Sequence, residues 1–211
     1  MDYDGHYTVG GFTGSGKSVF LMDLFDGCRS MVKIFFNSQL KHIKGVKVSN
    51  VDAMRRAFED GKRRLVFNPA SDIPTARAQL AGVIDVLFKM AKKMRHGETR
   101  EIWCSLFVDE GQDYAPKGDI AAALIQVWRQ GLEMGIQGVI CTQRFAEISH
   151  TILTQSKYVF FFRFNEFEKD YLERLYPVDK FWLHIQQPYH FAMVNLGELS
   201  LFKPIKYKSK S

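Results

Sequence analysis

Eight residues near the N-terminus constrain the fold of this chain more than any other segment. Residues 11–18 read G-F-T-G-S-G-K-S and fit the pattern G-x-x-x-x-G-K-S/T, in which glycines surround a polyphosphate. The segment follows a short apolar run, Tyr7 to Val9, and precedes a second apolar run that is expected to be helical. Strand, glycine-rich loop and helix occur in the order that a phosphate-binding loop (P-loop) requires. The sequence therefore predicts that this chain binds a nucleoside triphosphate.

Each residue type in the loop has a physical reason. Glycine lets the backbone turn its N–H groups toward an anion where a side chain would obstruct the approach. Lys17 is expected to contact the β- and γ-phosphates, and Ser18 to offer its hydroxyl to Mg²⁺ at the positive end of the helix that opens there and ends at Gly27. We expect nucleotide contacts from the whole loop: Gly11, Phe12, Thr13, Gly14, Ser15, Gly16, Lys17 and Ser18.

Two acidic residues end a buried strand about 90 residues after the P-loop. The apolar run Ile102 to Val108 is followed directly by Asp109 and Glu110. Ligands bind at the carboxyl ends of the strands in open α/β sheets, so both carboxylates are expected near the nucleotide. Asp109 is expected to support Mg²⁺, and Glu110 to orient and polarise the water that attacks the γ-phosphate.

A third strand, residues 138–142, also ends in polar groups. If this strand lies between the P-loop strand and the strand before Asp109, Gln143 can contact both the γ-phosphate and the attacking water. The sequence lacks the N-K-x-D motif with which switch GTPases read guanine. Hydrolysis coupled to motion is the reaction that this combination favours.

Strand and helix patterns alternate along the chain and predict an α/β sandwich with a mostly parallel central sheet. We expect one domain over residues 1–205 and a basic tail over 206–211. The expected strands are 31–36, 65–67, 102–108, 138–142 and 158–164. The expected helices are 51–60, 74 to about 95, 119 to about 134, and 148–154, and a β-hairpin is expected from 191–196 and 199–205.

The charge of the chain suits a polyanionic partner, because Lys and Arg number 29 against 23 Asp and Glu, a formal net charge of +6. Any one basic cluster is also what an ordinary solvated face would show. The clusters are Lys41, Lys44 and Lys47; Lys62, Arg63 and Arg64; Lys89, Lys92, Lys93, Arg95 and Arg100; and Lys203, Lys206, Lys208 and Lys210.

The three cysteines, Cys28, Cys104 and Cys141, are far apart in the sequence and are expected to be core thiols of a protein in a reducing compartment. The sequence has no signal-peptide pattern and no apolar stretch of about 18 residues that could cross a membrane. It therefore predicts an intracellular, soluble protein.

Four segments together resemble the FtsK/HerA superfamily of hexameric DNA-pumping ATPases. They are G-F-T-G-S-G-K-S at residues 11–18, F-V-D-E-G-Q-D at 107–113, G-I-Q-G-V-I-C-T-Q-R at 135–144, and I-L-T-Q-S-K-Y-V-F-F-F-R-F at 152–164. The resemblance spans nearly the whole chain. Because other superfamily members carry additional domains, this chain is most similar to the genome-packaging ATPases of icosahedral viruses with an internal membrane.

This resemblance implies a RecA-like (ASCE) core, a ring that is expected to be a hexamer, and ATP at each subunit interface. Double-stranded DNA would pass through a basic channel without sequence preference, and a capsid vertex or membrane protein is a further expected partner. Lys17 and Ser18 would bind phosphate and Mg²⁺, Asp109 would support Mg²⁺, Glu110 would be the catalytic carboxylate and Gln143 the sensor. The expected location is the host cytoplasm or a capsid vertex of the virion.

One segment departs from the family pattern. Members commonly carry an arginine in a G-R-x-x-G-like context, whereas residues 131–135 read G-L-E-M-G here. The candidates for an arginine that acts on a neighbouring subunit are therefore Arg129, Arg144 and Arg163, in no fixed order.

Two other functions compete with DNA translocation. The first is a morphogenesis or secretion motor that resembles the Zot-type proteins of filamentous phages, which usually carry a transmembrane segment. The second is a nucleotide-dependent clamp on DNA that barely hydrolyses ATP. The aromatic run 158–164 also suggests a base-stacking platform, but its expected place in the sheet favours core packing.

Overall fold

In the computed structural model, which describes residues 4–36, 43–94, 101–119 and 122–204, nine strands form one sheet. Seven strands from β3 to β7 are parallel, and β8 and β9 continue the sheet antiparallel. The spatial order is β3 (Val46–Val48), β4 (Arg64–Phe67), β2 (Val32–Phe36), β5 (Cys104–Val108), β6 (Ile136–Thr142), β1 (His6–Gly10), β7 (Ser156–Phe161), β8 (Phe191–Asn195) and β9 (Glu198–Phe202).

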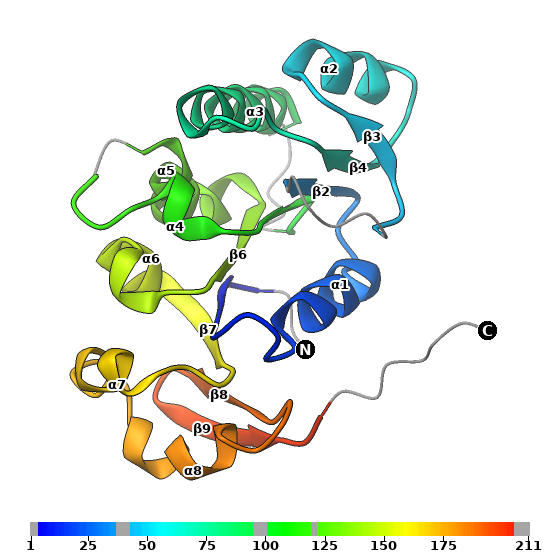
Figure 1. Cartoon of the computed structure of the whole chain (residues 1–211). Helices are drawn as coiled ribbons and strands as arrows, with labels where there is room; N and C mark the ends of the chain where they lie inside the picture. The colour runs from blue at the N-terminus through cyan, green and yellow to red at the C-terminus, as the bar shows by residue number, and fades with distance from the viewer. Residues whose placement is uncertain (1–3, 37–42, 95–100, 120–121, 205–211) are drawn as a thin grey trace.

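Helices cover both faces of this sheet, so its central strands are buried on both sides. Figure 1 shows α1 on one side of the strands and α3, α5, α6 and α7 on the other. The α-helices are α1 (Lys17–Gly27), α2 (Val51–Glu59), α3 (Ile73–Met94), α4 (Gly111–Tyr114), α5 (Ala123–Gln130), α6 (His150–Gln155), α7 (Glu166–Leu172) and α8 (Trp182–Ile185); the 3₁₀ turns are η1 (Leu132–Met134), η2 (Phe145–Glu147) and η3 (Val178–Lys180).

Two hydrophobic cores lie on the two faces of the sheet. The smaller core packs α1 through Phe20, Leu21 and Phe25 against side chains such as Phe35 and Phe160. The larger core joins α2, α3, α5 and α6 to the opposite face. Every residue of β5 and β6 is buried, which is why these strands read as continuous apolar runs rather than alternating ones. The expected α/β fold with a mostly parallel sheet is confirmed.

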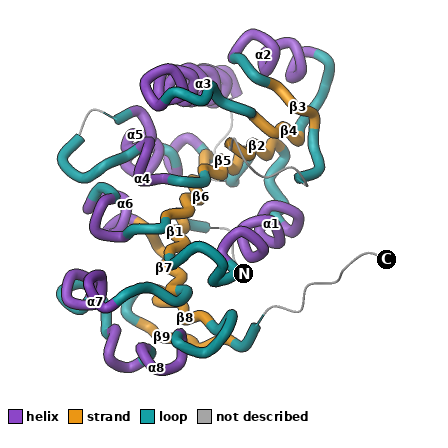
Figure 2. The backbone as a smooth tube through the Cα atoms, viewed as in Figure 1, coloured by secondary structure: helices purple, strands orange, loops and turns teal. Residues whose placement is uncertain are grey.

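The C-terminal hairpin is also confirmed, with β8 and β9 joined at Leu196 and Gly197. Both residues have positive φ, +48° and +89°, as the tight turns of two-residue hairpins require. Figure 2 shows the two strands at one end of the column of strands, opposite β3 and β4.

The helix expected from Asp119 to about Met134 is shorter than predicted and is interrupted before its end. Ala122 is extended, α5 begins at Ala123, and the helix gives way to η1 after Gly131. Gly131 keeps a helical backbone conformation, but a Cβ atom there would lie 2.4 Å from the Val127 carbonyl oxygen and 2.6 Å from that of Ile136, so this close approach favours glycine. Apolar periodicity continues through the turn and conceals it in the sequence.

Several other elements differ from expectation. Lys47 lies in β3, a short edge strand that pairs with β4 and that was not among the expected strands. The aromatic strand ends at Phe161 rather than Phe164, yet its phenylalanines are core residues, as expected. The short helices α4, α7 and α8 were not predicted.

Some predictions fall outside the described residues: the helix end at about Arg95, the hairpin end at Ile205, the tail 206–211, and the basic residues Lys41 and Arg100. The single domain over 1–205 stays a prediction. All three cysteines are buried free thiols. Within the described ranges, no helix is long and apolar enough to cross a bilayer.

Two phenylalanines allow a matched test of the core. Phe161 is fully buried with its ring 4.9 Å from that of Phe181, whereas Phe167 on α7 is 92% exposed. We expect Phe161→Ala to lower the free energy of unfolding by about 3 to 5 kcal/mol, because it leaves a cavity. Phe167→Ala should change it by no more than about 0.5 kcal/mol. Urea denaturation of both variants measures the difference, and equal effects would contradict the assignment of the core.

Candidate active site

The P-loop begins where β1 ends, and its glycines occupy backbone conformations that few other residues adopt. Gly14 and Gly16 have φ values of +78° and +103°, in the left-handed region. At Gly11 a Cβ atom would lie 2.7 Å from Cβ of Phe162, just beyond β7. The glycines of the pattern are therefore required by the path of the loop and by its close approach to the sheet.

Lys17 is the first residue of α1, and the loop itself holds its ammonium group. Lys17 Nζ donates to the carbonyl oxygen of Phe12 at 2.5 Å, and the same oxygen accepts from Ser15 Oγ at 2.7 Å. Burial lowers the pKa of Lys17, a shift that the nearby Asp109 and Glu110 oppose. A neutral carbonyl oxygen thus accepts the hydrogen bond of the Lys17 ammonium, and a phosphate oxygen could replace it as acceptor.

Asp109 and Glu110 follow β5 on the same edge of the sheet as the P-loop. Burial raises the pKa of Asp109, and the charge of Glu110 raises it further. Asp109 Oδ1 accepts from the backbone N–H of Glu110 at 3.0 Å. Glu110 itself has φ +53° and ψ +47°, a left-handed conformation that is uncommon outside glycine and concentrated at functional sites.

Gln143 connects the P-loop to Glu110. Its amide nitrogen donates to Glu110 Oε1 at 2.6 Å, and its Oε1 accepts from Thr13 Oγ1 at 2.7 Å. The other carboxylate oxygen of Glu110 accepts from Gln112 Nε2 at 2.8 Å, and Gln112 Oε1 accepts from Thr142 Oγ1 at 2.9 Å. β6 lies between β1 and β5, so the placement on which the expectation for Gln143 depended is confirmed.

The turn after Gln143 is anchored from α7. The carboxylate of Glu168, only 8% exposed, accepts from the backbone N–H groups of Phe145 at 2.7 Å and Ala146 at 3.3 Å. Asn165 caps α7 by accepting from the Glu168 N–H at 2.9 Å. The N-x-x-E spacing from Asn165 is a helix-start signal that sequence reasoning missed, although it does not reveal what the carboxylate contacts.

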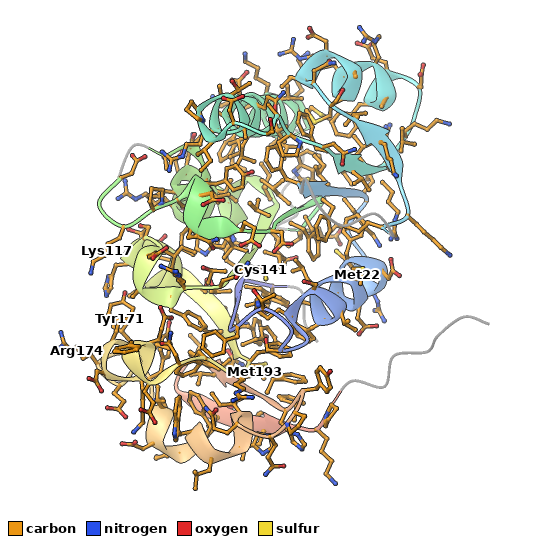
Figure 3. All side chains as sticks on the ribbon, in the orientation of Figure 1. Met22, Lys117, Cys141, Tyr171, Arg174 and Met193 are labelled. Atoms are coloured by element: carbon orange, nitrogen blue, oxygen red, sulfur yellow. The ribbon has the colours of Figure 1, made fainter. Side chains whose placement is uncertain are left out.

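The flank beside this turn is held by a further contact between distant segments. Figure 3 shows Lys117 and Tyr171 on the left flank of the molecule, and the Lys117 ammonium lies 5.4 Å from the Tyr171 ring centre. The backbone N–H of Lys117 donates to the Glu147 carbonyl oxygen at 2.7 Å. The segment after α4 is therefore attached both to η2 and to α7, the elements that carry the turn after Gln143.

Residues of the P-loop and residues that follow β5 and β6 surround one cavity of about 310 Å³. Sequence reasoning predicted most of its lining but missed Tyr189. The lining residues are Thr13, Gly14, Gly16, Lys17, Ser18, Val19, Asp109, Glu110, Gln143 and Tyr189. A larger hollow of about 480 Å³ between α3 and α5 is lined by none of these residues. We place the candidate site in the smaller cavity, because chemistry rather than volume identifies a nucleotide site.

The cavity fits Mg²⁺ by the chemistry of its donors. Ser18 and Asp109 both line this cavity, and a hydroxyl and a carboxylate are hard oxygen ligands of the kind that Mg²⁺ takes together with phosphate oxygens. A cation here would also offset the unfavourable burial of the Asp109 charge beside Glu110.

Two of the three candidate arginines, Arg144 and Arg163, lie at the P-loop edge of the sheet, and Arg129 lies at the opposite edge. Arg144 follows β6, is exposed, and pairs with Glu147. Arg163 is exposed beyond β7, and its carbonyl oxygen accepts from the Phe12 N–H at 2.7 Å. Arg129 is in the last turn of α5, which leads into the start of β6, so it lies at the edge opposite the P-loop. The fold therefore separates Arg129 from the cavity of its own chain.

No family model matches the chain, and no curated protein matches it in sequence. Among solved structures, the genome packaging NTPase B204 from Sulfolobus turreted icosahedral virus 2, in complex with ATP-gammaS, aligns with a TM-score of 0.74 and 15% identity. The alignment covers 97% of this chain and 100% of that one. This chain has the B204 fold. The DNA-packaging ATPase B204 from Sulfolobus Turreted Icosahedral Virus aligns with a TM-score of 0.72 at 15% identity, again over 97% of this chain and 100% of that one.

The B204 fold extends to part of a larger protein. The cytoplasmic domain of the Type VII secretion ATPase EccC from Thermomonospora curvata aligns with a TM-score of 0.58 at 16% identity, over 98% of this chain but 27% of that one. The expected structural resemblance to a packaging ATPase is therefore confirmed at the level of the fold.

Asp109 allows a test of the site without nucleotide. We expect Asp109→Asn to raise the melting temperature of the nucleotide-free protein, because it removes a charge that burial and Glu110 both disfavour while keeping the Oδ1 acceptor. The same variant should lose most of its Mg²⁺-dependent hydrolysis. Asp23→Asn, on the exposed side of α1, is the control and should change neither quantity. A lower melting temperature for Asp109→Asn would contradict the electrostatic account.

Proposed function

We propose that this chain is a Mg²⁺-dependent ATPase that moves double-stranded DNA, and that it packages a viral genome into a preformed capsid. One observation carries the proposal: Gln143 joins Glu110 to the P-loop residue Thr13 by two hydrogen bonds. A binding site for phosphate, a carboxylate that can polarise water and a side chain that touches both are what a hydrolysing motor requires. The alignment with B204 over nearly the full length of both chains supports the packaging role.

The residues of the cavity would divide the reaction among them. When ATP binds, the phosphates replace the Phe12 carbonyl oxygen as partner of the Lys17 ammonium. Ser18 and Asp109 would hold Mg²⁺, which neutralises charge on the phosphates. Glu110 would orient and polarise the attacking water as general base.

Gln143 would couple this chemistry to the rest of the subunit. In the structure its amide holds one oxygen of Glu110, and contact with the γ-phosphate would compete with that hydrogen bond. The change would pass to the turn at Phe145, which Glu168 attaches to α7. DNA-facing segments would respond through this turn.

A ring would complete the site. An arginine from the neighbouring subunit is expected to stabilise charge that develops on the γ-phosphoryl group, with an effect of about 10³ to 10⁵ in rate. Arg129 suits this role because it lies at the edge of the sheet opposite its own P-loop. Arg144 and Arg163 remain alternatives, and a hexamer in the host cytoplasm or at a capsid vertex is the expected assembly.

The first test is ATP hydrolysis with and without long duplex DNA. We expect duplex DNA to stimulate hydrolysis, and Glu110→Gln to lower kcat by about 10² to 10⁴ while ATP binding is kept. Lys17→Ala should lose ATP binding itself, and Glu59→Gln at the exposed end of α2 is the control. A rate of ATP hydrolysis that is the same with and without DNA would favour a secretion-type motor instead. ATP binding without turnover would favour a clamp.

The second test concerns salt. Contacts to DNA phosphates release counterions, so the logarithm of duplex affinity should fall linearly with the logarithm of salt concentration. Fluorescence anisotropy with two duplexes of equal length and unrelated sequence measures this dependence. Equal affinities for the two duplexes are expected, and an affinity that stays constant between about 50 and 200 mM salt would contradict a phosphate-lined channel.

A further inference from the structure

Tyr189 occupies a tight turn in a conformation that rarely suits tyrosine. The turn comprises residues 187–190 and is closed by a hydrogen bond of 3.2 Å from the His190 N–H to the Gln187 carbonyl oxygen. Pro188 takes the second position and Tyr189 the third, with φ +61°. Glycine or asparagine is the usual residue at a third position with positive φ, because a Cβ atom is strained there.

Packing of the Tyr189 ring in the core does not offset this backbone strain. The side chain is 58% exposed. The neighbouring aromatic cluster of Phe20, Phe162 and Phe191 contains rings 4.9 to 5.5 Å apart, and it excludes Tyr189. Within the part of the chain that the structure describes, the Tyr189 ring has no aromatic or hydrogen-bond partner. Strained residues without a packing role concentrate at ligand sites.

The ring instead forms a wall of the nucleotide cavity. Tyr189 Cδ1 lies 3.4 Å from the position that a Cβ atom on Gly16 would take, so the ring stands directly over the P-loop. It shares the cavity with Lys17 and Ser18. A residue with a flat apolar face is therefore presented at a phosphate-binding loop.

The order of the strands decides which end of a nucleotide meets this ring. Asp109 and Glu110 follow β5, which lies two strands from β1 on one side. Tyr189 precedes β8, which lies two strands from β1 on the other side, and β8 starts at the same edge because it runs antiparallel to β7. A triphosphate bound to the P-loop with its γ-phosphate toward Glu110 must extend its ribose and base toward Tyr189.

We propose that Tyr189 is the platform on which the base of the bound nucleotide stacks. This inference rests on the proposed function, since it assumes that the P-loop holds a nucleoside triphosphate. An aromatic face stacks on any purine, so the ring would add affinity for the base and orient the phosphates without contacting them. Tyr189 is thus a positioning residue for hydrolysis and a binding residue for the base.

The test compares ATP with inorganic tripolyphosphate, which has the phosphates but no base. Calorimetric titration of the full chain with each compound, in the presence of Mg²⁺, is carried out on the parent protein, Tyr189→Gly and Tyr189→Phe. We expect Tyr189→Gly to weaken ATP binding by about tenfold, the loss of one base–aromatic stack, and to leave tripolyphosphate binding unchanged. Tyr189→Phe should keep both affinities.

A matched control separates the role of the ring from the relief of strain. Leu196 has φ +48° and is 83% exposed in the hairpin turn, away from the residues that line the cavity. Leu196→Gly and Tyr189→Gly should both keep or raise the melting temperature without nucleotide, whereas only Tyr189→Gly should weaken ATP binding. Unchanged ATP binding in Tyr189→Gly, or equal loss for ATP and tripolyphosphate, would overturn the proposal.

Failure of the proposed function gives a different pattern. If the parent protein binds neither ATP nor tripolyphosphate, or if Lys17→Ala leaves both affinities unchanged, the P-loop is not a nucleotide site and both proposals fall. If Lys17→Ala abolishes binding of both compounds while Tyr189→Gly keeps the affinity of the parent protein for ATP, only the role of Tyr189 is overturned.

Discussion

Gln143 sits between Thr13 and Glu110 because β6 pairs in parallel with β1 on one side and with β5 on the other. Parallel register brings the carboxyl ends of the three strands to one edge, so each strand delivers a different chemical group there. β1 leads into the glycines of the P-loop, β5 into the two acids and β6 into an amide that can donate and accept at once. A shift of β6 by one residue would turn the side chains of its end to the other face of the sheet.

Close packing behind the cavity keeps that edge in place. A Cβ atom at Gly10 would lie 2.1 Å from the Phe145 ring, and one at Gly111 would lie 2.3 Å from Ile140. The first contact joins the P-loop strand to the turn after Gln143, and the second joins the segment after Glu110 to β6. Relative motion of the three strands would therefore disturb the larger core, on the face of the sheet opposite α1. Close-packed interiors resist such displacement.

The sequence alone was sufficient for the elements whose patterns are strong. The P-loop, the runs before Asp109 and Gln143 and the hairpin were all placed within a few residues, because glycine positions and buried strands leave a clear record. The expected helix between Asp119 and Met134 was too long, because apolar periodicity continues across Gly131 although α5 ends at Gln130 and a 3₁₀ turn follows. Sequence reasoning also failed at β3, where two exposed residues and a length of three residues give too weak a pattern.

Contacts between distant segments account for what the sequence could not reveal. Nothing near Glu168 indicates that its carboxylate holds the turn at Phe145, because the two are joined only by the fold. The same holds for Tyr189. Pro188 indicates the turn in the sequence, but the position of Tyr189 over Gly16 depends on how β1, β7 and β8 pair in the sheet. The strand order was needed before the neighbours of Gln143 could be named.

In the proposed ATPase, the hydrogen bond from Lys17 to the Phe12 carbonyl oxygen would have a consequence for repeated turnover. Because the loop supplies its own acceptor, an arriving phosphate would replace one partner of the ammonium by another and would not have to order a free side chain from solvent. When the phosphate left, the lysine would return to the same oxygen. Such a site would return to its starting arrangement after each cycle, and the Lys17 side chain would gain or lose little conformational entropy.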